Sequence, residues 1–217
     1  MPRRSFLEID KVNGTEFPPN SVNYETRTYS LKSIFEKAEI ELDIREDESN
    51  ITDLGGPDSR YSQSELLSLM RTHKNPQYHE TDDKWSTYLV IVTKFVEDYV
   101  LGIMFDSKNR LGSAVFYQED TIRDDPRAFL RTAAHELGHQ FNLHHQDGST
   151  YKEGKVTKNT IMNQTRLVTP WPEALSYEFS DHSKRHLSQH PEDNVKPGGS
   201  RFLDCTDEHS GWHGGIT

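Results

Sequence analysis

Residues 133–148, "AAHELGHQFNLHHQDG", place four histidines and one glutamate within eleven residues. The stretch is expected to lie on a helix, because Asp125 suits the N-cap position and Pro126 the first helical position just upstream. The same residues could form a metal site or a polar surface helix that is rich in histidine. The spacing of the side chains separates the two interpretations.

The apolar residues of this helix fall on one side. At about 100° per residue, His135 and His139 lie together on nearly the opposite side, with Glu136 beside them. We therefore expect one side to pack against the core and the other to offer two imidazoles and a carboxylate. Four residues form the core stripe: Leu130, Ala134, Leu137 and Phe141.

Two histidines four residues apart on a helix can direct their nitrogens at one ion about 2.0–2.1 Å away. Catalytic zinc usually takes three protein ligands and a water, so a third ligand is needed. Asn142 favours a sharp turn after the helix, because asparagine tolerates the left-handed backbone conformation. Such a turn would bring His144 or His145 back beneath the pair. Glu136 would then act as a general base, not as a ligand.

The segment "HELGHQFNLHH", residues 135–145, resembles the extended HExxHxxGxxH signature of the metzincin metallopeptidases. The resemblance implies that His135, His139 and His145 bind one catalytic zinc ion and that Glu136 is the general base. Asn142 replaces the usual glycine, a mild departure given its backbone tolerance. By spacing, His144 remains an alternative to His145.

The resemblance extends to a methionine-containing turn beneath the metal. Met162, in "NTIMNQ", follows His145 by seventeen residues and is similar in position to that turn, although it could be an ordinary core methionine. Some branches carry a ligating tyrosine two residues after this methionine. Gln164 occupies that place here, so no fourth protein ligand is expected from it.

Substrate contacts are also predicted from the resemblance. "LGSAVF", residues 111–116, is similar to the edge strand that pairs with an extended substrate, which makes Gly112, Ser113 and Ala114 candidate substrate-binding residues. The alternative is an ordinary strand within the sheet. Tyr177 could line the pocket or stabilise an oxyanion, or it could simply pack in the core.

The predicted fold is α+β: a metzincin-like, twisted, mixed and mostly parallel sheet with an active-site helix and a small C-terminal helical subdomain. Residues 1–190 are assigned to a single catalytic domain and residues 191–217 to a polar, mobile tail. The remaining local patterns predict helices from Ser30, from Ser62 and within residues 180–190, and strands in residues 4–12, 41–47, 85–96, 99–106 and 111–118.

Composition restricts the partners and the compartment. The 217 residues include 25 basic and 35 acidic ones, a net charge of −10, and no run of Lys or Arg, which argues against nucleic acid or an anionic membrane as partner. Cys205 is the only cysteine, so no intrachain disulfide can form, although this thiol could reach the zinc from the tail. A cytoplasmic location is favoured, but a chain whose export signal had been removed would look the same.

These patterns predict a zinc endopeptidase that hydrolyses peptide bonds with metal-activated water and a glutamate base. The alternative is a non-catalytic, zinc-stabilised module that binds peptides or proteins. Glu136 favours the enzyme, because a binding module has no need of a carboxylate at that position. The partner expected in both cases is a peptide or protein, and the oligomeric state is not predicted.

Overall fold

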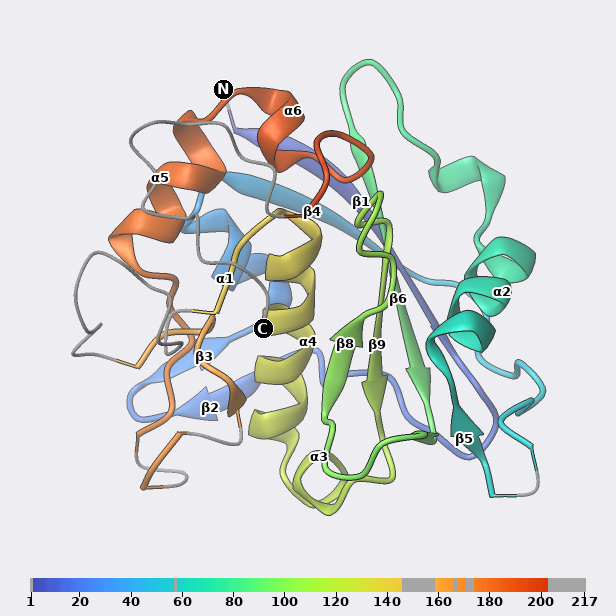
Figure 1. The fold of residues 1–217 in the computed structure, drawn as a ribbon. Coiled ribbons are helices and arrows are strands. Elements are labelled where there is room, and N and C mark those ends of the chain that lie inside the picture. Colours follow the sequence, from blue (N-terminus) through green and yellow to red (C-terminus); the bar gives the residue numbers. More distant parts are fainter. Residues whose placement is uncertain (1, 57, 146–158, 166–167, 171–173, 203–217) are drawn as a thin grey trace.

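A five-stranded mixed sheet forms the centre of the protein (Figure 1). The computed structural model describes residues 2–56, 58–145, 159–165, 168–170 and 174–202. Four strands of the sheet are parallel, and the last pairs antiparallel at one edge. The sheet order is β4 (Ile40–Glu46), β1 (Arg3–Lys11), β6 (Trp85–Val92), β9 (Gly112–Phe116) and β8 (Gly102–Met104).

Helices cover both faces of this sheet. Figure 1 shows α4 (Pro126–Gln140), α1 (Leu31–Glu36) and α5 (Asp181–Gln189) on one side and α2 (Gln63–His73) on the other. Each face has its own apolar core, as the period-2 alternation of strands requires. The smaller elements are β2 (Val22–Tyr24), β3 (Arg27–Tyr29), β5 (Arg60–Tyr61), η1 (Pro76–Tyr78), β7 (Lys94–Phe95), α3 (Asp120–Asp124) and α6 (Glu192–Val195).

Strand β1 shows this alternation. Leu7 and Ile9 belong to the core on the α4 side. Glu8 and Asp10 alternate with them and therefore point to the α2 side, where both are fully buried. One strand thus contributes aliphatic side chains to one core and carboxylates to the other.

The helix starts follow the capping residues predicted from the sequence. Ser30 caps α1, and Ser62 caps α2 in a reciprocal capping box with Glu65. Asp125 caps α4 by accepting a hydrogen bond from the backbone N–H of Arg127. The predicted mixed α/β architecture is confirmed. In addition, no helix in the described ranges is long and apolar enough to cross a membrane.

Part of the segment assigned to the tail packs against the domain. The fully buried Arg110 donates hydrogen bonds to the backbone oxygens of Val195, Lys196 and Ser200, and also to that of Gln140 at the end of α4. Residues 191–202 are therefore attached to the helix that carries the histidines, while residues 203–217 lie outside the described residues.

Candidate metal centre

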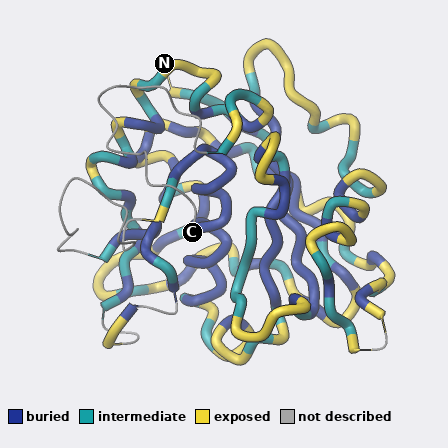
Figure 2. Tube along the Cα trace, in the orientation of Figure 1, coloured by how far each residue is buried: buried dark blue, intermediate teal, exposed yellow. Residues whose placement is uncertain are grey.

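Helix α4 carries His135, Glu136 and His139 and is buried along its whole length after Arg127 (Figure 2). The sequence predicted one packed and one open side. The structure instead leaves His135 only 4%, Glu136 5% and His139 7% exposed. The difference arises because the segment around Met162 and the chain after Asn142 cover the side opposite the sheet.

The turn predicted at Asn142 is confirmed. Asn142 has a left-handed φ of 64°, and its amide group donates a hydrogen bond from Nδ2 to the backbone oxygen of Asn194, 2.9 Å away. The backbone N–H of Leu143 bonds back to the carbonyl of Gly138 at 3.0 Å, which ends the helix. The chain then reverses and carries His145 back to the helix.

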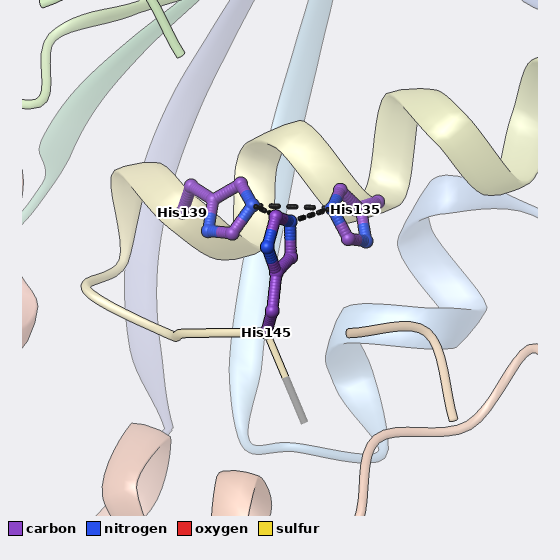
Figure 3. Close-up of side chains that lie close together, drawn as sticks. All are labelled: His135, His139 and His145. Atoms are coloured by element: carbon purple, nitrogen blue, oxygen red, sulfur yellow. Dashed lines mark hydrogen bonds between the residues drawn. The ribbon is translucent and has the colours of Figure 1, made fainter. Parts of the chain in front are cut away.

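The three imidazoles converge through their Nε2 atoms (Figure 3). The Nε2 atoms are 3.1 Å apart between His135 and His139, 3.0 Å between His135 and His145, and 3.2 Å between His139 and His145. Two nitrogens bound to one tetrahedral zinc at the usual distances are about 3.3 Å apart. The nitrogens are therefore spaced as ligands of one zinc ion would be.

Hydrogen bonds fix the tautomers of the two helical histidines. Nδ1 of His135 lies 2.7 Å from the backbone oxygen of Ile161, and Nδ1 of His139 lies 2.7 Å from that of Leu143. Because a carbonyl oxygen only accepts, each Nδ1 carries the proton and each Nε2 keeps a lone pair for a metal. Burial lowers the pKa of His139 to about 3 and that of His135 well below its usual value, so both rings stay neutral.

His145, not His144, completes the set. The ring of His144 instead stacks on Phe202, with centroids 4.9 Å apart and planes at 19°. Gln164 approaches His145 on the outer side of the ring, with its amide nitrogen 3.4 Å from Nδ1. A carboxamide can present either its oxygen or its nitrogen, so the Gln164 side chain can accept a hydrogen bond from Nδ1–H when Nε2 carries the lone pair.

Arg131 holds the loop beneath the site. It lies one helical turn before His135 and is fully buried. Its guanidinium donates to the backbone oxygens of Thr160 and Asn163, at 2.7 and 2.8 Å, and to the hydroxyl of Thr165 at 2.6 Å. Arg131 was not predicted from the sequence, where its signal is an arginine four positions before the first histidine.

Met162 lies in the turn that Arg131 anchors and is fully buried against the helix. A Cβ added to Gly138 would come within 2.5 Å of the Met162 sulfur. Gly138 lies between His135 and His139 in sequence, and its missing side chain is what allows the methionine to pack against this turn of the helix.

Glu136 projects between the helix and the edge strand β8. A Cβ on Gly102 would come within 2.8 Å of Glu136 Oε1, so only glycine leaves room for the carboxylate there. Burial raises the pKa of Glu136 to about 8, and a hydrogen bond from the backbone of Met104 partly opposes the shift. A cavity of about 390 Å³ adjoins this carboxylate and is also lined by His135, His145, Gly102 and Gln164.

The prediction that residues 111–116 form an edge strand is wrong. Strand β9 is paired with β6 on one side and with β8 on the other, so the backbones of Gly112, Ser113 and Ala114 are already paired and all three residues are buried. The edge is β8. Interior and edge strands share the same apolar pattern, so the local sequence did not distinguish them.

Ser113 supports the helix instead of a substrate: its hydroxyl donates to the backbone oxygen of Glu136 at 3.1 Å. Tyr177 is also a packing residue. Only 1% exposed, it stacks on Tyr29 with centroids 4.7 Å apart and donates its hydroxyl proton to the backbone oxygen of Arg127. Cys205 lies outside the described residues.

The comparisons with known proteins give a fold but no sequence family. No protein-family model matches the chain, and no curated protein matches it. The fold is similar to that of a zinc-dependent peptidase from Methanocorpusculum labreanum (strain Z), with a TM-score of 0.51 and 17% sequence identity. The similarity covers 84% of this chain and 98% of that one. At this identity the likeness describes the architecture, and the chemistry has to be argued from the residues.

Proposed function

We propose that this chain is a metzincin-like zinc endopeptidase with a single catalytic zinc ion. The observation that carries the proposal is the triangle of Nε2 atoms on His135, His139 and His145, with the Nδ1 atoms of the first two bonded to carbonyl oxygens. The zinc-dependent peptidase of similar fold supports it. Zinc, when bound, supplies an acidified water and a Lewis acid for the substrate carbonyl.

Glu136 is the proposed general base. Its carboxylate lies on the same cavity as His135 and His145 and has been taken almost completely out of solvent. Because its pKa is raised, the ionised carboxylate accepts a proton from water more readily than a surface glutamate does. It would then pass that proton to the amine that leaves from the cleaved bond.

The proposed substrate-binding strand is β8, which replaces the one expected from the sequence. The backbone groups of Leu101 and Phe105 bond to β9, so those of the alternate residue Gly102 face away from the sheet, beside Glu136. An extended peptide could add to this edge and bring a carbonyl to the carboxylate. Met162 takes the position of the Met-turn in this proposal, beneath the histidines.

The test is cleavage of a mixed peptide library by the purified full chain, with zinc content measured on the same sample. We expect cleavage by the wild type, and a loss of about 10²–10⁴-fold in Glu136→Gln with its zinc content unchanged. Glu41→Gln is the matched control, since Glu41 is exposed on the opposite edge strand.

Full activity of Glu136→Gln would refute the proposed mechanism. One zinc per chain with stoichiometric peptide binding and no turnover would favour the non-catalytic binding module instead. Cleavage that persists after chelation and needs no zinc would exclude the metal from the reaction.

A further inference from the structure

A second cluster of metal-binding side chains lies on the α2 side of the sheet. Glu8 and Asp10 project from β1, and Asp47 follows the end of the neighbouring parallel strand β4. One carboxylate oxygen from each residue lies within 4.8 Å of the others. The histidines belong to the opposite face, so this cluster is separate from the candidate metal centre.

Hydrogen bonds hold all three of these carboxylates in place. Asp10 accepts from the backbone N–H of Glu48 through Oδ1 and from the hydroxyl of Tyr88 through Oδ2, both at 2.9 Å. Glu8 accepts from the backbone N–H of Asn75 through Oε1 at 2.8 Å. The carboxylates are thus oriented by the loop after α2, by the end of β4 and by β6.

The second carboxylate oxygen of Glu8, Oε2, differs from the oxygens that accept hydrogen bonds. Glu8 is fully buried, and its Oε2 has no hydrogen-bond partner among the described residues. A buried carboxylate oxygen without a partner is costly, because the water that would solvate it has been removed. The oxygen therefore requires a proton or a cation. Burial also raises the pKa of Glu8 to about 7 and that of Asp10 to about 6.

The basic side chains nearby do not supply the missing partner. Lys74, at the end of α2, attracts Glu8 electrostatically, but no ion pair within 4.0 Å joins the two in the described ranges. Arg45 lies opposite Glu8 in the strand register and pairs with Asp43 at 2.9 Å. The remaining charged neighbour, Glu48, is acidic and pairs with His73.

We propose that Glu8, Asp10 and Asp47 bind a hard divalent cation, calcium, on the α2 face of the sheet. Carboxylate oxygens are the ligands that such cations prefer. The three oxygens lie within 4.8 Å of one another, close enough for a single calcium ion to contact all of them at its usual ligand distances of about 2.3–2.6 Å. The hydrogen bonds that already fix these carboxylates favour calcium over magnesium, which demands near-ideal octahedral geometry.

The test is calorimetric titration of the chelator-treated full chain with calcium chloride, with magnesium chloride as a second arm. We expect one calcium per chain and an affinity at least about tenfold lower in Glu8→Gln and Asp10→Asn. Glu46→Gln is the matched control: Glu46 is exposed, precedes Asp47 and points to the other face. Before the chelator treatment, all variants should have the zinc content of the wild type.

No calcium binding by the wild type at about 10 mM would overturn the proposal and leave protonation as the means of neutralising Glu8. An equal loss of calcium affinity in Glu46→Gln would mean that general surface charge causes the effect, and this result would also overturn the proposal. Tighter binding of magnesium would refute the choice of calcium. If the Glu8 and Asp10 variants do not fold, the calcium titration of Asp47→Asn, at the margin of the cluster, is the test. Unchanged calcium affinity in that variant would refute the site.

Discussion

The histidine cluster and the carboxylate cluster lie on opposite faces of one sheet, and their side chains differ in how they are hydrogen-bonded. The nitrogens of His135 and His139 that do not face the proposed metal are bonded to carbonyl oxygens. In the carboxylate cluster, by contrast, Glu8 keeps an oxygen without a partner among the described residues. In the first cluster the atoms left for a cation are nitrogens of neutral rings, and in the second they include an oxygen of an acidic group.

The difference follows from the charge of the ligands. Neutral imidazoles can be buried close together at little electrostatic cost, and burial lowers the pKa of His139 to about 3, which keeps the ring neutral. Carboxylates buried together repel one another, and each must be paired, protonated or bound to a cation. Metal removal should therefore affect the histidine side through activity and the carboxylate side through stability.

The largest expected effect on the histidine side comes from Arg131→Met. The substitution leaves the carbonyls of Thr160 and Asn163 without their buried donor, so the free energy of unfolding should fall by about 3–5 kcal/mol. Because the same loop carries the carbonyl that orients His135, zinc affinity should also fall by about 10–100-fold. Denaturant unfolding and zinc titration measure the two effects.

Arg127→Met is the control, since Arg127 lies on the same helix and pairs with Asp125 near its start. Wild-type zinc affinity in a folded Arg131→Met chain would show that the loop does not orient the ligand.

The residues at the turn show how much of the site was accessible from the sequence. Helical spacing placed His135 and His139 on one side, and the backbone tolerance of Asn142 predicted a reversal that returns His144 or His145; in the structure it returns His145. These are local properties, set by the helix period and by one left-handed residue. The capping residues fixed the helix starts for the same reason.

The missed features depend on contacts between distant segments. The edge of the sheet was assigned to residues 111–116, because local pattern does not tell which of two successive apolar strands has the free side. The role of Arg131 requires the loop at Thr160, 29 positions away, to lie against the helix. Glu8 and Asp10 alternate with apolar residues in their strand, and polar side chains in such a pattern usually face solvent. In the structure, α2 and the chain after it bury both residues.

Gly138→Ala should have the next largest effect. The new methyl group would overlap the sulfur of Met162, and overpacking of this kind costs about 1–3 kcal/mol, partly offset by the better helix propensity of alanine. Pairing it with Met162→Ala should recover part of the loss, because the smaller side chain leaves room. A double-mutant cycle on thermal unfolding measures the coupling, and strict additivity would show that the two residues do not pack together.

Glu8→Gln should stabilise the metal-free protein, which distinguishes the carboxylate side from the histidine side. The pKa of Glu8 is raised to about 7 in the folded chain, so the folded state holds the proton more tightly than the unfolded one. Stability should therefore fall as pH rises from about 4 to 7 and stay low above that range. Glutamine removes this penalty, so Tm should rise by about 2–4 °C at pH 8 and change little at pH 4.

Saturating calcium should reverse the order of stability of the two proteins, because it binds the wild type more tightly than the variant. A Glu8→Gln chain that is less stable than the wild type at pH 8 without calcium would mean that the carboxylate is already neutralised in the native state. Glu46→Gln, exposed on the neighbouring strand, controls for the loss of one negative charge.

The smallest effect is expected from Asn142→Gly, and it is informative because two terms oppose each other. Glycine relieves the cost of a left-handed backbone, about 1 kcal/mol, at φ 64°. It also removes the hydrogen bond from Nδ2 to Asn194, worth about 1 kcal/mol. The free energy of unfolding should therefore change by less than about 0.5 kcal/mol. Asn142→Ala should be clearly less stable, because alanine loses the hydrogen bond and still has the cost of the left-handed backbone. If glycine were as damaging as alanine, the hydrogen bond to the C-terminal segment, and not the backbone conformation, would be what asparagine contributes at this turn.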